Sequence, residues 1–245
     1  MLTTLQYRML RRFWPTAPKI LTGAAYIGKS KVKVLLGEQL ISDIQGKVVI
    51  DFGCGRGDQA IELALAGAKR VVGIDIRESF LQEARERARR AGVDDRCVFT
   101  TTPEPADAIV SLDSFEHFDE PYKILQTMYD DLLPRGGFVA TSFGPTWYHP
   151  YGGHTFSMFP WAHLVFAEKA LVRWRADFQD DGATRFSEVS GGLNQMTIGR
   201  FERLVAASPF RLEFLEAVPI RRLKHLHNRL TREFTTAIVR AKLLK

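Results

Sequence analysis

Residues 48–57 read VVIDFGCGRG, an apolar, β-branched run that ends in glycines at alternate positions. The run predicts a buried strand, and the glycines predict a tight loop whose backbone N–H groups can come close to a ligand. Helical spacing of apolar residues resumes over 58–66. A strand, a glycine loop and a helix in this order aim a helix N-terminus at an anionic group, so the stretch indicates a nucleotide-like ligand.

The glycine spacing distinguishes between classes of nucleotide ligand. The dinucleotide fingerprint Gly-x-Gly-x-x-Gly fails by one position, because Gly57 comes early and Asp58 stands where the last glycine belongs. A carboxylate at that helix start would repel a pyrophosphate. The loop therefore favours a ligand that carries a carboxylate, an ammonium and a ribose over a dinucleotide.

Strand and helix patterns alternate on both sides of this loop. Further strands are expected at 70–75, 97–100, 108–111, 138–142, 211–215 and 237–244, and helices at 35–44, 78–91 and 121–133. Thr197 is expected to cap another helix. This alternation predicts an α/β fold, a doubly wound, mostly parallel seven-stranded sheet with helices on both faces.

Composition supports one globular domain over all 245 residues, with 45% hydrophobic and 25% charged residues. Neither a run of 18 apolar residues nor a secretory leader is visible, so a cytoplasmic protein is expected. Cys54 and Cys97 offer no disulfide framework, and no metal-ligand cluster is predicted.

Basic residues gather at the two ends of the chain. The residues before Glu38 carry a net charge of +7, those from Arg221 onward also carry +7, and the middle carries −8. Solvated helix faces, an anionic substrate, a membrane surface or nucleic acid would each account for this asymmetry. Peripheral membrane contact therefore stays open, and no oligomeric state is predicted.

Four motifs occur in order and at fixed separations within residues 47–142. They are the glycine loop at 49–57, the strand end at 71–75, the segment 107–118, and Leu133-Pro134-Arg135-Gly136-Gly137 before a strand. Together they resemble the class I S-adenosylmethionine-dependent methyltransferases of the small-molecule type. The resemblance implies a Rossmann-like sheet, S-adenosyl-L-methionine as cofactor, and methyl transfer as the activity.

The resemblance also divides the chain into parts. Residues 1–45 would form an N-terminal helical cap, 46–142 the cofactor-binding core, 143–195 an aromatic-rich insertion at the acceptor site, and 196–245 a closing helix and strands. The cofactor-binding residues that it implies are Asp51, Gly53, Cys54, Gly55, Asp75, Ile76, Thr102 and Leu112. Asp75 would accept hydrogen bonds from the ribose hydroxyls, Asp51 would lie near the methionine ammonium, and Leu112 would lie beside the sulfonium. Glu104 is a candidate acid for the adenine loop.

The segment after the fourth strand, Ser111 to Phe115, bears on the acceptor. It lacks the Asn/Asp-Pro-Pro-aromatic motif of enzymes that methylate base amines and the Pro-Cys pair of cytosine C5 enzymes, which disfavours a nucleic acid. A small-molecule acceptor is therefore predicted, with lipids and natural products among the candidates. An RNA methyltransferase, or a methyltransferase-like module without turnover, is the alternative.

Histidines and aromatic residues crowd the insertion. Trp147, Tyr148, Tyr151 and Trp161 offer flat amphipathic surfaces, and His149, His154 and His163 are expected to titrate near neutrality. His154, after two glycines, is the preferred general base, and His117 is the second candidate. A core aromatic cluster with hydrogen-bonded histidines would be the structural alternative.

Overall fold

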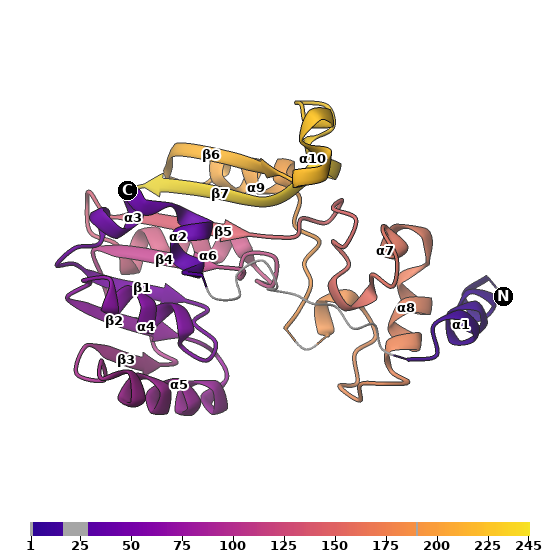
Figure 1. The fold of residues 1–245 in the computed structure, drawn as a ribbon, viewed down its shortest axis with the longest axis horizontal. Coiled ribbons are helices and arrows are strands. Elements are labelled where there is room, and N and C mark those ends of the chain that lie inside the picture. The colour runs from indigo at the N-terminus through magenta and orange to yellow at the C-terminus, as the bar shows by residue number, and fades with distance from the viewer. Residues whose placement is uncertain (1, 17–28, 190) are drawn as a thin grey trace.

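The computed structural model of the chain describes residues 2–16, 29–189 and 191–245. The expectation for residues 1–45 falls partly outside them. The described residues form one seven-stranded sheet with strand order β3-β2-β1-β4-β5-β7-β6 (Figure 1). Its strands are β1 (Val48–Phe52), β2 (Arg70–Ile74), β3 (Cys97–Thr100), β4 (Ala108–Leu112), β5 (Phe138–Phe143), β6 (Arg211–Pro219) and β7 (Thr236–Leu244).

Strands β1 to β5 pair in parallel, and β7 runs antiparallel between β5 and β6. The helices are α1 (Leu2–Phe13), α2 (Lys31–Leu36), α3 (Glu38–Asp43), α4 (Asp58–Leu65), α5 (Glu78–Ala91), α6 (Pro121–Thr127), α7 (Ala162–Val165), α8 (Glu168–Arg175), α9 (Ile198–Ala207) and α10 (Arg232–Thr235). A π-helix, η2 (Met128–Leu132), and short 3₁₀ turns, η3 (His154–Phe156), η4 (Phe186–Glu188) and η5 (Arg221–Leu226), complete the set. The predicted doubly wound sheet is confirmed.

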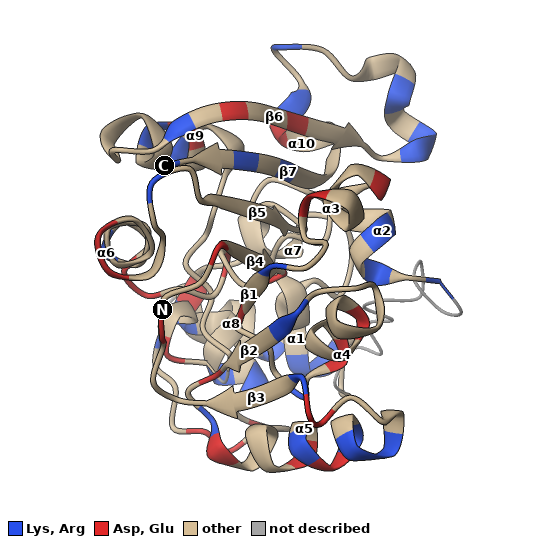
Figure 2. Cartoon of the chain, turned by 90° about the vertical axis from the view of Figure 1, so that its left-hand side faces the viewer, with Lys and Arg blue, Asp and Glu red and all other residues tan. Residues whose placement is uncertain are grey.

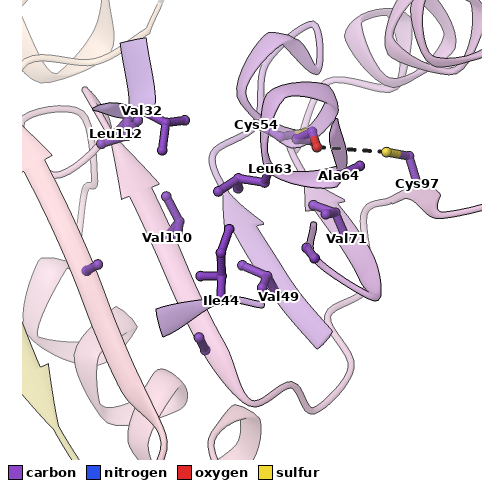
Figure 3. Close-up of a cluster of buried hydrophobic side chains, with 14 of the residues drawn as sticks. Val32, Ile44, Val49, Cys54, Leu63, Ala64, Val71, Cys97, Val110 and Leu112 are labelled. Atoms are coloured by element: carbon purple, nitrogen blue, oxygen red, sulfur yellow. Dashed lines mark hydrogen bonds between the residues drawn. The ribbon is translucent and has the colours of Figure 1, made fainter. Parts of the chain in front are cut away.

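Two hydrophobic clusters cover the two faces of the sheet, because successive strand residues point to opposite faces. Val49 joins a cluster with α2, α3, α4 and α5, part of which Figure 3 shows. The Cys97 thiol of this cluster lies 3.8 Å from the Ala60 carbonyl. Ile50 joins a second cluster with α6, η2 and α9 on the other face. Burial on both faces explains why the central strands β1, β2 and β4 each contain a short continuous apolar run.

A third cluster forms the core of the insertion, away from the sheet. Phe156, Leu171, Trp174 and Phe186 are buried in it, and α1 contributes Leu10. The N-terminal helix therefore packs on α8 of the insertion, beyond the carboxyl ends of the strands (Figure 1).

Two helix predictions were wrong in detail. The helix expected over 35–44 is two helices, because Gly37 adopts a φ of 86° that interrupts the backbone hydrogen-bond ladder. Ser30 caps α2 by accepting a hydrogen bond from the Lys33 amide. The helix expected over 121–133 changes from α6 to the π-helix η2 at Met128. Thr197, as predicted, caps α9 by accepting a hydrogen bond from the Arg200 amide.

Candidate functional site

The carboxyl ends of β1, β2, β4 and β5 lie at one edge of the sheet, because these strands are parallel. Open α/β sheets bind their ligands at this edge. The insertion follows β5 directly and lies beyond the same edge (Figure 1). The edge and the insertion together therefore form the candidate site.

The glycine loop after β1 has the backbone that its sequence predicts. Gly53, Gly55 and Gly57 have φ angles of 86°, 53° and 80°, which side chains with a Cβ rarely adopt. A Cβ on Gly53 would lie 2.4 Å from the Ser114 hydroxyl, so only glycine fits there. A Cβ on Gly55 would face open space. A ligand can therefore approach the backbone of this loop at Gly55.

Asp75, one residue beyond β2, is held by its neighbours through both carboxylate oxygens. Its Oδ2 accepts hydrogen bonds from the Gly55 amide at 3.1 Å and from Arg77 Nη2 at 3.2 Å. Its Oδ1 accepts from the Arg77 amide at 2.9 Å and from Arg77 Nε at 3.0 Å. Burial works to raise the pKa of Asp75, but the hydrogen bonds and charge of Arg77 hold it below its usual value. Asp75 is thus an anion that couples the glycine loop to β2.

The other residues implied for the cofactor differ widely in exposure. Ile76 is 93% exposed, and Thr102 is also exposed after β3. Leu112 is buried at the end of β4. Cys54 is buried as well, and because burial raises the pKa of its thiol, it stays protonated at neutral pH. Glu104 lies elsewhere: it forms an ion pair with Arg70, at the opposite end of β2.

Asp51, near the end of β1, is almost fully buried. Among the described residues its Oδ2 has no hydrogen-bond partner. Burial raises the pKa of Asp51 to about 7, while the charge of Lys31 opposes this rise. Lys31 itself pairs with Asp113 at 2.7 Å, just after β4. An ammonium or another hydrogen-bond donor would satisfy the Asp51 carboxylate.

The loop after β4 carries a buried acid to which the sequence reasoning gave no role. Glu116 accepts a hydrogen bond from the Gly144 amide through Oε1, whereas its Oε2 has no partner in the described part of the chain. Burial raises the pKa of Glu116 to about 8, with the nearby charge of Asp113 in support. The available signal was its position between Phe115 and Phe118, two residues that pack edge-to-face.

The two candidate bases lie side by side although 37 positions separate them in the sequence. The rings of His117 and His154 are 5.4 Å apart between centroids. His117 Nδ1 lies 2.8 Å from the Gly192 carbonyl, which can only accept, so Nδ1 carries a proton and Nε2 is the nitrogen that can offer a lone pair. Burial lowers the pKa of His154 to about 4, so that it is neutral at pH 7, and its Nε2 has no partner among the described residues.

The remaining histidines of the insertion play structural parts. His163 is held between the Trp147 carbonyl and the Ser157 hydroxyl, and His149 accepts a hydrogen bond from the Tyr151 amide. The expectation that the insertion histidines titrate near neutrality was wrong, because burial lowers the pKa of His149 to about 4, as for His154, and also lowers that of His163.

The aromatic residues of the insertion divide between core and surface. Trp147 packs against His163 and Phe186 within the third cluster. Tyr148 and Tyr151 are exposed, and the partly buried Trp161 donates a hydrogen bond to the Tyr148 carbonyl. Only part of the predicted aromatic surface is therefore free to meet an acceptor.

Six of the ten buried side-chain polar atoms that lack a hydrogen-bond partner among the described residues belong to the ends of β1 and β5, the loop after β4 or the insertion outside α8. They are Asp51 Oδ2, Glu116 Oε2, Ser142 Oγ, Thr146 Oγ1, His154 Nε2 and Asn194 Oδ1. Buried polar groups are nearly always paired, so such a group of atoms marks a place built to bind something polar. A separate groove over β5, β7 and β6 contains none of them, and it is lined by Leu36, Gln39, Leu40, Asp43, Ala140, Glu213, Phe214, Ala241 and Lys242.

Comparison with known proteins agrees with this geometry. Residues 44–157 match the model of a family described as a methyltransferase domain. The ribosomal protein L11 methyltransferase of Pectobacterium carotovorum is 36% identical over 101 residues, which make up 41% of this chain and 34% of that protein. This chain thus spans about a third of the length of the curated relatives that it matches.

Two solved structures share the fold. An S-adenosylmethionine-dependent methyltransferase from Mesorhizobium loti aligns over 84% of this chain and 96% of its own, with a TM-score of 0.55 and 16% identity. Geranyl diphosphate C-methyltransferase from Streptomyces coelicolor, solved with Mg²⁺, geranyl diphosphate and S-adenosyl-L-homocysteine, aligns over 84% and 76%, with a TM-score of 0.54 and 16% identity. At this identity the likeness concerns the fold.

Proposed function

We propose that this chain is a class I S-adenosylmethionine-dependent methyltransferase, which transfers a methyl group from S-adenosylmethionine to a small-molecule acceptor. The observation that carries the proposal is the sheet edge itself. At this edge lie the glycine loop, where the space beside Gly55 is open, and the buried polar groups that follow β4 and β5.

The residues at the ends of β1 and β2 fit the cofactor. Gly53 and Gly55 would let the methionine end approach the backbone, and the unpartnered Asp51 oxygen would receive its ammonium. Asp75 would accept hydrogen bonds from the ribose hydroxyls, and these would replace some of the hydrogen bonds that Arg77 now donates to the carboxylate. Around them, Cys54 and Leu112 would supply buried surface, and Ile76 and Thr102 exposed surface for the adenine. When bound, the sulfonium supplies an electrophilic methyl group for in-line displacement.

The residues of the insertion and of the loop after β4 hold the acceptor and move its proton. His154 is neutral at pH 7 and has a free Nε2, so it can accept the proton that a hydroxyl loses as it is methylated, or the proton that an ammonium loses before its nitrogen attacks. His117 is the alternative base, with its lone pair fixed on Nε2 by the Gly192 carbonyl. Glu116, held in the protonated form near neutral pH, would donate a hydrogen bond to the acceptor through its free oxygen.

Other acceptors define the alternatives. The relatives named above are methyltransferases of a ribosomal protein, and a solved neighbour methylates geranyl diphosphate at carbon. A protein or RNA acceptor would need a broad contact surface, whereas the unpaired polar atoms here are buried. This burial favours a small molecule, lipids included. A binding module without turnover would keep the glycine loop but would not need the histidine pair.

Two measurements test the proposal in order. Isothermal titration calorimetry with S-adenosylmethionine should give saturable binding, and its absence would remove the enzymatic reading. The protein is then incubated with S-adenosylmethionine labelled in the methyl group and with separate fractions of small metabolites, extracted lipids, RNA and ribosomal proteins. We expect label in the metabolite or lipid fraction. Label in RNA or ribosomal protein would show that the acceptor is a macromolecule rather than a small molecule, and the proposal of methyl transfer would stand.

A further inference from the structure

The connection between β6 and β7 forms a projecting hairpin, residues 220–231, here called the basic hairpin. Its cations are Arg221, Arg222, Lys224 and Arg229, all exposed, and no acid lies between Glu216 and Glu233. None of the four cations pairs with an acidic residue of the described chain. Figure 2 shows these Lys and Arg positions on a loop that extends past the end of the sheet.

Leucines share the hairpin with these cations. Leu230 is 91% exposed and Leu226 is 50% exposed. Hydrogen bonds nevertheless hold the hairpin in place. The Ile220 amide donates to the Thr235 carbonyl of α10 at 2.8 Å, and Asn228 Oδ1 accepts from the Leu230 amide at 2.9 Å. Its fold therefore holds the leucines outward beside the cations.

The place of the hairpin in the fold gives it a functional context. Strand β6 runs parallel to β5, because both are antiparallel to β7. The hairpin thus leaves the sheet at the edge that carries the candidate site (Figure 1). Phe234, in α10 just after the hairpin, stacks on Tyr148 of the insertion at 5.2 Å between ring centroids.

A second element of the same character packs on the insertion. Helix α1 contains three arginines and no acid, and one of the three, Arg11, pairs with Asp177 of the insertion at 3.4 Å. Its exposed apolar residues recur at helical spacing and form one stripe: Leu2, Leu5, Met9 and Phe13. The helix attaches through Leu10, which is buried against the insertion, so the stripe faces away from the core of the protein.

We propose that the basic hairpin and helix α1 bind the surface of an anionic lipid bilayer. Exposed aliphatic side chains would enter the region between headgroups and acyl chains, and the arginines and the lysine would contact lipid phosphates. No helix in the described ranges is long and apolar enough to cross a membrane, so the contact is peripheral. Leucines at the tip favour lipid over RNA, because single-stranded RNA binds through aromatic stacking together with cations.

Binding to vesicles tests the proposal without cofactor or acceptor, so its failure is distinct from a failure of methyl transfer. The whole protein is sedimented with vesicles of phosphatidylcholine, or of phosphatidylcholine mixed with phosphatidylglycerol. We expect binding to the mixed vesicles only. The double variant Leu226→Ser/Leu230→Ser and the double variant Leu5→Ser/Phe13→Ser should each weaken binding roughly tenfold or more.

Matched controls separate this effect from a general loss of apolar surface. Leu65→Ser/Val98→Ser removes two exposed aliphatic side chains from α4 and β3 and should bind like the unchanged protein. Circular dichroism confirms that each variant is folded. Equal binding by the hairpin variant and the unchanged protein would overturn the proposal. The proposal would also be overturned if the protein bound an RNA oligonucleotide but not anionic vesicles, and if the double variant Arg222→Glu/Lys224→Glu abolished that RNA binding.

Discussion

The two sides of the sheet edge differ in how fully their buried polar groups are hydrogen-bonded. On the cofactor side, at the ends of β1 and β2, the carboxylate of Asp75 receives four hydrogen bonds from Gly55 and Arg77. On the acceptor side, after β4 and β5, Glu116 and His154 each keep a buried atom without a partner among the described residues. Asp75 is therefore preorganised by the protein itself, whereas the unpartnered atoms of the acceptor side, like Asp51 Oδ2 beside the glycine loop, depend on what binds there.

The difference also determines the ionisation of the two sides. Hydrogen bonds keep Asp75 charged, while burial keeps Glu116 protonated and His154 neutral near pH 7. A charged carboxylate suits ribose hydroxyls, and neutral groups suit an acceptor that must lose a proton. Four substitutions test this contrast, from the largest expected effect to the smallest.

Gly55→Val should abolish binding of S-adenosylmethionine. A branched side chain would fill the open approach beside the loop and would strain a backbone with φ near 53°. Calorimetry should show at least a roughly 100-fold loss of affinity. Gly92→Val is the control, because Gly92 has a similar φ of 67° and faces open space at the end of α5. Tight binding by the Gly55 variant would contradict the cofactor side as drawn.

His154→Ala should lower turnover about 100-fold and leave the affinity for S-adenosylmethionine nearly unchanged. The reason is that His154 is assigned to the acceptor side and contributes no group to the cofactor. Initial rates with the acceptor found by methyl labelling measure the effect.

His149→Ala serves as the comparison, because His149 has a similarly lowered pKa but accepts the Tyr151 amide. It should change turnover little. If His117→Ala alone abolishes turnover, the base is His117. Equal losses of cofactor affinity and turnover in His154→Ala would make His154 a structural residue.

Asp75→Ala should weaken S-adenosylmethionine binding by about 1.5–3 kcal/mol, because charge-assisted hydrogen bonds to the ribose are lost. Arg77→Ala separates two roles of the arginine. If Arg77 competes with the ribose for the carboxylate, affinity in Arg77→Ala should hold or rise. A loss as large as that of Asp75→Ala would instead show that Arg77 positions the carboxylate.

Glu116→Gln should raise the melting temperature by a few degrees at pH 8 and by less at pH 5. The folded protein holds the Glu116 proton up to about pH 8, whereas the unfolded chain loses it near the usual value. The folded state therefore binds more protons, and this group costs stability increasingly as the pH rises through that window. Glutamine keeps the bond from Gly144 and removes the titration.

The control is Glu120→Gln, at an exposed acid that pairs with Lys123. Thermal unfolding of both variants at the two pH values provides the comparison. A gain for Glu116→Gln that is independent of pH would mean that burial does not hold the Glu116 proton.

Local sequence signals predicted the sheet and the conformation of the glycine loop. Gly53 and Gly55 can adopt the positive φ of a tight loop without steric cost, and β-branched runs between helices predict parallel strands. The break at Gly37 was missed because the apolar spacing continues across it.

The acceptor side was less predictable because its properties depend on residues far apart in the chain. Glu116 is hydrogen-bonded to Gly144 and His117 to Gly192, and Asp113 forms an ion pair with Lys31. The pKa of His154 follows from burial, which no local pattern reveals. The pairing of the two candidate bases was therefore compatible with the sequence but could be seen only in the fold.

Strand β7 affects the order in which the protein can assemble on the ribosome. Because β7 lies between β5 and β6, residues 211–219 leave the exit tunnel before the strand that they need as a neighbour. Until residues 236–244 emerge, β5 exposes one hydrogen-bonding edge and β6 exposes both. A nascent chain halted after α9 would therefore carry the glycine loop and the histidine pair beside an open sheet edge, and exposed strand edges favour aggregation.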